Sequence, residues 1–209
     1  AGGEPVAVLS EIDAVFESGS VTLISGPTGV GKTTLLHLLA GLLRPTMGEV
    51  CWGTSVVSRW HSNHLDRWRR RVGIVFQHQQ LLMDLSAGEN VLLPLIPRKL
   101  PLATQAATVE ATLRQVGLAE KAARSTAQLS GGERQRLALA RAMAGKPAIL
   151  LADEPTAFQD DAWAERLIQL LRAERNRGAV VIACSHDPRL LQGNPFDQHC
   201  RLDQGRLGT

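Results

Sequence analysis

Hydrophobic residues along this chain form short continuous runs that alternate with runs at helical spacing. The short runs predict strands at residues 21–25, 48–52, 72–76, 148–152 and 179–184. Apolar positions three or four residues apart predict helices at residues 32–43, 130–144 and 162–176. Strands that alternate with helices are typical of an α/β fold, in which helices cover both faces of a mostly parallel sheet.

The segment from about residue 79 to residue 128 has a different pattern. Prolines at positions 94, 97 and 101 precede an alanine-rich run that predicts a helix near residues 103–116. We interpret this segment as an inserted helical subdomain. The prediction is one domain over residues 1–209, with residues 1–78 and 129–209 forming its core.

Composition supports a globular chain with one core. The sequence has 209 residues, of which 44% are hydrophobic and 21% charged. Its apolar runs are shorter than the roughly 18 residues that span a bilayer, and residues 1–5 lack the features of a signal peptide. We therefore expect a soluble, cytosolic protein. The three cysteines, Cys51, Cys184 and Cys200, are expected to be buried free thiols rather than metal or redox ligands.

The formal net charge of +3 is modest, and the basic residues gather in one place. Arg67, Arg69, Arg70 and Arg71 surround Trp68, a pattern that fits a solvated helix end better than a surface for nucleic acid or lipid headgroups. His61 and His64 lie nearby without a carboxylate or cysteine at matching spacing, so we expect surface histidines rather than a metal site.

Residues 26–33 match the phosphate-binding pattern G-x-x-x-x-G-K-[ST] between a predicted strand and a predicted helix. The glycines let backbone amides curve around phosphate groups, the lysine neutralises their charge, and the threonine hydroxyl ligates Mg²⁺. The predicted nucleotide-binding residues of this segment are Gly26, Pro27, Thr28, Gly29, Val30, Gly31, Lys32, Thr33 and Thr34.

Polar residues follow three of the predicted strands. Asp153 and Glu154 end a buried strand, where Asp153 is placed to hold Mg²⁺ and Glu154 to face the attacking water. His186 follows the strand at residues 179–184, and Gln77 ends the strand at residues 72–76. Since parallel strands end at one edge of a sheet, we expect these side chains to meet the phosphates there.

Ser130, Gly131 and Gly132 precede Glu133 at the predicted start of a helix. The glycines leave backbone amides uncovered and the serine adds a hydroxyl, so the segment is suited to receive an anion.

Taken in order, the phosphate-binding loop, Gln77, Leu129-Ser130-Gly131-Gly132-Glu133, Asp153-Glu154 and His186 resemble the nucleotide-binding subunits of ABC transporters over essentially the whole chain. The resemblance implies a P-loop NTPase fold with a small antiparallel β part, and the ligands ATP and Mg²⁺. It implies that Gln77 contacts Mg²⁺ and that Ser130 to Gly132 close over the γ-phosphate bound by the opposite subunit. Glu154 would polarise water, His186 would support the γ-phosphate, and Lys32 would complete the catalytic set. Asp160 resembles the aspartate of the dimer-contact loop.

Residues 72–77, Leu81-Leu82 and residues 89–95 resemble more narrowly the branch of lipoprotein-release, macrolide-export and cell-division ATPases. This implies a second ATPase subunit, with an identical copy expected, integral membrane permease partners, no nucleic acid, and a peripheral position on the inner face of the cell membrane. Gln79 and Met83 depart from that branch where the partner docks, and Gln159 replaces an apolar residue of the dimer-contact loop.

The family usually stacks adenine on an aromatic upstream of the phosphate-binding loop, where this chain has only Phe16. Phe16 alternates with Ile12 and Ala14, which predicts the buried face of a strand rather than base stacking.

Two alternative functions remain. One is an ATPase that controls a non-transporting membrane complex, such as a cell-division complex. Another is a soluble ABC ATPase acting on DNA or ribosomes, although such relatives carry long insertions or two cassettes. A P-loop kinase or GTPase is disfavoured because the Ser-Gly-Gly segment would have no role.

Overall fold

The computed structural model describes residues 8–191 and 196–208, so the prediction about residues 1–5 lies outside the described residues. Its main sheet has six strands in the order β4-β5-β6-β1-β7-β8. Parallel pairing joins all neighbours except β7 and β8, which are antiparallel. The strands are β1 (Ser20–Ser25), β4 (Val72–Val75), β5 (Ile149–Asp153), β6 (Val180–Cys184), β7 (Gln198–Asp203) and β8 (Arg206–Gly208). The predicted mostly parallel sheet is confirmed.

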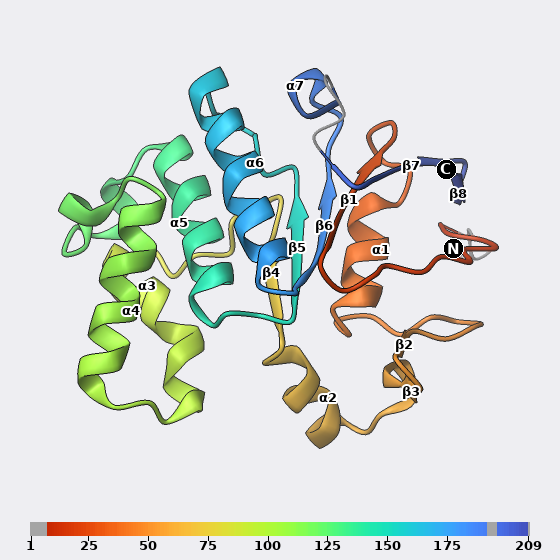
Figure 1. Ribbon diagram of the computed structural model, residues 1–209, viewed down its shortest axis with the longest axis horizontal. Coiled ribbons are helices and arrows are strands. Elements are labelled where there is room, and N and C mark those ends of the chain that lie inside the picture. The colour runs from red at the N-terminus through yellow and green to blue at the C-terminus, as the bar shows by residue number, and fades with distance from the viewer. Residues whose placement is uncertain (1–7, 192–195, 209) are drawn as a thin grey trace, which may run out of the picture.

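Two apolar clusters cover the two faces of this sheet. Because successive strand side chains point to opposite faces, Leu150 and Ala152 join the cluster with α5 and α6, whereas Ile149 and Leu151 join the cluster with α1 and α2. Figure 1 shows α5 and α6 on one side of the sheet and α1 on the other. These helices are α1 (Lys32–Leu39), α2 (Ser62–Arg69), α5 (Gly131–Ala144) and α6 (Asp161–Asn176).

The segment predicted to be inserted contains helices that extend the first cluster. Buried residues of α3 and α4, such as Val91 and Leu113, pack with Leu137 of α5. The elements are α3 (Ala87–Leu92), η2 (Leu93–Arg98), α4 (Leu102–Gln115), η3 (Ala119–Lys121) and η4 (Thr126–Gln128). In Figure 1, α3 and α4 lie beyond α5, away from the sheet.

Smaller elements complete the fold. A two-stranded antiparallel sheet pairs β2 (Cys51–Trp52) with β3 (Ser55–Val56). It is followed by the 3₁₀ turn η1 (Val57–Arg59), and α7 (Pro188–Leu191) follows the loop after β6. Across the residues that the structure describes, no helix is long and apolar enough to cross a membrane.

Several predicted boundaries are wrong. The helix predicted at residues 32–43 ends at Leu39, because Gly41 adopts φ +69° and packs so closely on α2 that a Cβ would lie 2.8 Å from Leu65 Cδ1. The strand predicted at residues 48–52 is confined to the short hairpin strand β2.

Two predictions about individual side chains are also corrected. The strand predicted around Phe16 is absent from residues 8–19, and Ala14 is exposed, although Phe16 and Ile12 do pack partly buried on the second cluster. All three cysteines are free, but Cys51 is exposed and only Cys184 and Cys200 are buried. Cys51 lies on the small hairpin, where its side chain is exposed and the neighbouring Trp52 is partly buried.

The arginines around Trp68 lie at the C-terminal end of α2. All four are exposed while Trp68 is buried, as predicted for a solvated helix end. Arg69 also donates hydrogen bonds to the Gly41 carbonyl oxygen and to Asp66. His61 precedes α2 as its N-cap residue and His64 lies within it; both are exposed, and the His64 ring packs edge-on against Trp60.

Candidate functional site

The loop between β1 and α1 has a backbone that requires glycine. Gly26 has φ +153°, and a Cβ there would lie 2.2 Å from the Leu202 carbonyl oxygen of β7. Gly31 has φ +110°, and its Cβ would lie 2.8 Å from Leu9 Cδ2. Only glycine fits both positions without displacing neighbours. The loop therefore curves tightly between the sheet edge and the start of α1, as the phosphate-binding pattern predicts.

Lys32 begins α1, and its ammonium group lies inside the curve of this loop. Its Nζ atom donates hydrogen bonds to the carbonyl oxygens of Gly26 at 2.7 Å and Pro27 at 3.0 Å. The same atom lies 3.8 Å from Glu154 Oε1, and the side chain is only 7% exposed. A buried positive charge is thus fixed between the glycine loop and a carboxylate.

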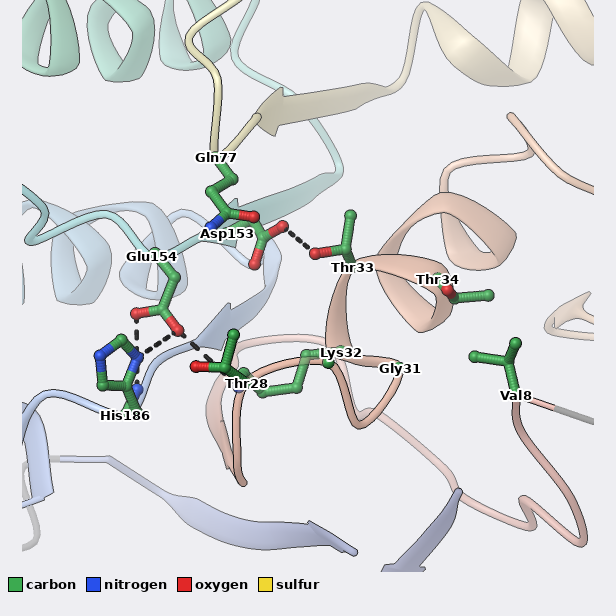
Figure 2. A pocket seen from close by; sticks show the side chains of 11 residues that line it. Val8, Thr28, Gly31, Lys32, Thr33, Thr34, Gln77, Asp153, Glu154 and His186 are labelled. Atoms are coloured by element: carbon green, nitrogen blue, oxygen red, sulfur yellow. Dashed lines mark hydrogen bonds and ion pairs between the residues drawn. The ribbon is translucent and has the colours of Figure 1, made fainter. Parts of the chain in front are cut away.

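Thr33 and Asp153 form the next part of the site. The Thr33 hydroxyl donates to Asp153 Oδ2 at 2.5 Å, which connects α1 to the end of β5. Burial raises the pKa of Asp153, while the hydrogen bond from Thr33 opposes that shift. In Figure 2 the Gln77 side chain extends from the end of β4 toward the same carboxylate. Hydroxyl, carboxylate and amide oxygens are hard donors of the kind that Mg²⁺ prefers, so this cluster fits the ion.

Glu154 is held in an unusual backbone conformation. Its φ is +48°, its amide donates to the Cys184 carbonyl oxygen at 2.9 Å, and its own carbonyl oxygen accepts from Gln135 Nε2 at 3.3 Å. A left-handed non-glycine residue is costly, and such strain persists where surrounding contacts fix it. The conformation turns the carboxylate back over the sheet edge.

The Glu154 carboxylate meets the residues that follow β6. Its Oε1 atom lies 2.7 Å from His186 Nδ1, and its Oε2 atom accepts from the Ser185 hydroxyl at 3.0 Å. The carboxylate is 12% exposed and His186 is 65% exposed. Figure 2 shows the imidazole next to the Glu154 carboxylate, at the end of the site opposite Val8. Ser185 was missed by sequence reasoning, since its position between Cys184 and His186 carries no motif.

These residues surround one open cavity of about 160 Å³. Its lining consists of Val8, Thr28, Gly29, Gly31, Lys32, Thr33, Thr34, Gln77, Asp153, Glu154 and His186. Val8 was not predicted. Its side chain is 46% exposed and gives the cavity an apolar wall opposite the acidic residues. The only sequence signal was one valine upstream of the loop, which is too weak to identify a site residue.

Ser130, Gly131 and Gly132 lie outside that cavity, at the N-terminus of α5. The Ser130 hydroxyl accepts from the Glu133 amide at 3.2 Å, and Glu133 Oε2 accepts from the Ser130 amide at 2.9 Å, forming a capping box. Lys121 pairs with the other carboxylate oxygen. The Lys121 ammonium and the Ser130 hydrogen bonds lower the pKa of Glu133 to about 2.

Asp160 also lies outside the cavity. Its carboxylate caps α6 by accepting from the Trp163 amide at 2.8 Å. The adjacent Gln159 donates from Nε2 to the Gly132 carbonyl oxygen at 2.7 Å. The polar replacement noted at position 159 therefore connects this loop to the Ser-Gly-Gly segment.

Comparison with known proteins agrees with this arrangement. Residues 9–157 match the sequence profile of the family described as ABC transporter. The chain belongs to the ABC transporter family. It is an ABC ATPase, and the branch suggested by the sequence is confirmed by its curated relatives.

Two relatives and one solved structure illustrate the match. The chain is 41% identical to the lipoprotein-releasing system ATP-binding protein LolD of Idiomarina loihiensis, over 91% of this chain and 85% of the relative. It is 38% identical to the cell division ATP-binding protein FtsE of Escherichia coli K12, over 92% and 86%. Its fold is similar to the dimeric post-hydrolysis structure of the ATP-binding cassette MJ0796 bound to ADP and Pi, with a TM-score of 0.92 and 31% identity over 100% of this chain and 92% of that one.

The fold of this ABC ATPase brings together only part of the predicted site. The cavity gathers most of the phosphate-binding loop, Gln77, Asp153, Glu154 and His186. Gly26, Pro27 and Val30 shape the loop without lining the cavity, and residues 130–132 and 160 face elsewhere.

Proposed function

We propose that this ABC ATPase hydrolyses ATP in the cavity at the end of β1, β5 and β6, and that two copies act together to drive an integral membrane partner. The observation that carries the proposal is the position of Glu154. Its carboxylate lies beside the Lys32 ammonium and His186, at the edge of a cavity whose other wall is a glycine loop. A carboxylate in that position is suited to orient and deprotonate an attacking water.

Nucleotide binding rests on the loop and Lys32. The glycine loop leads directly into the N-terminus of α1, where unpaired backbone amides and partial positive charge favour phosphate. Lys32 adds a full positive charge on the same side of the site. In this structure its ammonium group donates hydrogen bonds to two carbonyl oxygens of the loop. The apolar side chain of Val8 is placed to contact the base or sugar rather than the phosphates.

The metal site consists of Thr33, Asp153 and Gln77. When bound there, Mg²⁺ supplies positive charge to the oxygens of the β- and γ-phosphates. The existing contact between the Thr33 hydroxyl and Asp153 Oδ2 keeps these two donors together before the ion arrives.

Glu154 and His186 have different roles at the γ-phosphate. Ser185 and His186 hold the Glu154 carboxylate in one orientation beside the cavity, where it is suited to accept a proton from an attacking water. His186 is exposed enough to contact the γ-phosphate directly. The residue pair therefore positions a water on one side and stabilises phosphate charge on the other.

A second copy completes each site. Ser130 to Gly132 offer amides and a hydroxyl at the N-terminus of α5 but lie outside the cavity of their own subunit. The solved relative MJ0796 is described as a dimer with ADP and Pi. These two facts support assembly of two chains in which each Ser130 segment covers the partner's nucleotide and Asp160 lies near the contact.

The membrane partner is proposed from the relatives. LolD is named for lipoprotein release and FtsE for cell division. We assign residues 79–128 as the helical subdomain that receives the partner, with the nucleotide-binding core formed by residues 1–78 and 129–209. Leu82 and Met83 are exposed apolar residues just beyond Gln77, at 50% and 41%. Such an arrangement keeps the ATPase on the inner face of the membrane through its partner.

A cell-division role is the second candidate, because the FtsE relative matches almost as well as LolD. The identity of the integral membrane protein that co-purifies with the chain distinguishes the two roles.

Replacing Glu154 with glutamine tests the catalytic assignment. The amide preserves the size of the side chain but does not accept a proton, so we expect Glu154→Gln to lower the ATPase rate about 100-fold or more. ATP binding should remain, and the variant should accumulate as an ATP-bound dimer in size-exclusion chromatography. Glu165→Gln, at an exposed position of α6, is the matched control. Hydrolysis by Glu154→Gln at the wild-type rate would show that the base is another residue.

A further inference from the structure

Arg189 joins the loop after β6 to the loop after β5. Its Nε atom lies 3.0 Å from both carboxylate oxygens of Asp187, and Nη2 donates to Asp187 Oδ2 at 2.6 Å. Its Nη1 atom donates to the Gln159 carbonyl oxygen at 2.9 Å and to Asp161 Oδ1 at 3.2 Å. Asp187 is only 14% exposed, and Arg189 holds the pKa of Asp187 well below its usual range. The pair is therefore a stable ionic connection between the two loops.

One end of this connection reaches the catalytic carboxylate. The Asp187 amide donates to the Ser185 hydroxyl oxygen at 3.1 Å, and that hydroxyl donates to Glu154 Oε2 at 3.0 Å. The position of the Arg189–Asp187 pair therefore affects the orientation of the Glu154 side chain.

The other end reaches the Ser-Gly-Gly segment. Gln159, whose carbonyl oxygen is held by Arg189, donates from its side chain to the Gly132 carbonyl oxygen at 2.7 Å. The loop is close to the helix here, because a Cβ on Gly132 would lie 2.9 Å from the Phe158 carbonyl oxygen. A continuous series of hydrogen bonds thus runs from the Glu154 carboxylate to the Gly132 peptide.

In the proposed dimer these two ends serve different nucleotides. Glu154 acts on the ATP of its own subunit, and Gly132 belongs to the segment that covers the ATP of the partner. Resting on that proposed function, we infer that Arg189 is a positioning residue that couples the two ATP sites of the dimer. Movement of the loop around one γ-phosphate shifts the amides that receive the other.

A second contact between α5 and the loop after β5 does not involve Arg189, so removal of the Arg189 guanidinium should affect coupling without unfolding this region. Gln135 of α5 donates to the Glu154 carbonyl oxygen at 3.3 Å, independently of Arg189. Loss of the Arg189 guanidinium therefore leaves α5 attached to the Glu154 backbone and Gln159 bonded to Gly132, but interrupts the series of hydrogen bonds between Asp187 and Gln159.

The test compares ATPase rates of wild type and Arg189→Met over a range of ATP concentrations, with enough subunit present to dimerise. Two coupled sites give the wild type a Hill coefficient between 1 and about 2. We expect Arg189→Met to lower this coefficient to about 1 and to lower the maximal rate. Binding of a fluorescent ATP analogue to dilute subunits should not change. Arg201→Met is the matched control, since Arg201 is 70% exposed and its guanidinium lies 4.0 Å from the Asp203 carboxylate.

Gln159→Leu breaks the same connection at its other end. It should lower the Hill coefficient as Arg189→Met does, and the double variant should be no worse than either single variant, because both lie on one path. Circular dichroism confirms that each variant is folded.

The outcomes separate the two proposals. A wild-type chain that neither hydrolyses ATP nor dimerises contradicts the proposed function itself. A wild type that does both, with a Hill coefficient of 1 or with an unchanged coefficient in Arg189→Met, overturns the coupling role of Arg189 alone. Additive losses in the double variant would also overturn it, since they place the two residues on separate paths.

Discussion

Gly26 lies where the phosphate-binding loop leaves β1, against the backbone of β7. A Cβ at this position would lie 2.2 Å from the Leu202 carbonyl oxygen, so alanine forces the two backbones apart. We expect Gly26→Ala to lower the free energy of unfolding by about 2 to 3 kcal/mol, from strained φ and the lost close approach. Urea denaturation measures this loss.

Gly29 provides the control for this substitution. It also has a positive φ of +82°, but a Cβ there would meet nothing within 4 Å. Gly29→Ala should therefore cost only the backbone strain, about 1 kcal/mol. Equal losses of unfolding free energy in Gly26→Ala and Gly29→Ala would show that the close approach to Leu202 does not contribute to the cost of a side chain at position 26.

Site residues that belong to a motif with fixed spacing were predictable from the sequence. Site residues that reach the cavity through contacts with distant parts of the chain were not. Lys32, Asp153 and Glu154 lie together because a glycine pattern and a strand end determine their positions locally. Val8 lies at the cavity with its backbone packed closely against Gly31 and Gly205, which come from two separate parts of the chain. Sequence patterns do not contain such contacts.

The N-terminus of α5 is fixed by the Ser130–Glu133 capping box and by Lys121. Because Lys121 and Ser130 lower the folded-state pKa of Glu133 from 4.5 to about 2, the folded state favours the carboxylate. The stability that Glu133 contributes is therefore complete above about pH 4.5 to 5 and is lost as the pH falls toward 2.

Glu133→Gln tests this contribution. At pH 7 the variant should be less stable than the wild type by about 1 kcal/mol, a typical value for a helix cap. The difference should shrink as the pH is lowered from 5 to 3, as followed by urea denaturation at each pH. Glu165→Gln should show no comparable pH-dependent difference, because Glu165 is exposed on α6. A difference that stays constant with pH would contradict the ionised cap.

Strands and helices with a strong pattern of hydrophobic residues were predicted well. Strands that form because of their pairing partners in the folded chain were not. Strands β5 and β6 are buried along their whole length, so their continuous apolar runs identify them. β7 alternates exposed and buried residues and is polar in sequence, and it is a strand because it pairs with β1. The apolar residues Ile12 and Phe16 pack partly buried on the second cluster, but residues 8–19 form no strand.

Assembly of two copies depends on a segment that faces away from its own nucleotide cavity. Ser130→Arg removes the hydroxyl and adds a large cation where the partner's phosphate is proposed to lie. We expect ATP binding by dilute subunits to be unchanged, while dimer formation and hydrolysis are lost. Lys32→Ala should instead weaken binding itself, because Lys32 lies within the cavity. Equilibrium binding and size-exclusion chromatography with ATP separate these two effects.

Ser18→Arg serves as the control, since Ser18 is exposed in a turn before β1. Weakened ATP binding by dilute Ser130→Arg subunits would indicate that Ser130 acts within its own subunit.

β1 is an inner strand of the sheet, and both of its neighbours come from the last part of the chain. Ser20 pairs with Val180 on one side, and Thr22 pairs with Gln198 on the other. The Val21 amide donates to the Asp197 carboxylate, 176 positions away. Because the ribosome releases a chain from its N-terminus, β1 emerges long before either partner exists. Folding of this ATPase therefore waits for the closure of very long loops, which slows it and leaves an apolar strand unpaired during synthesis.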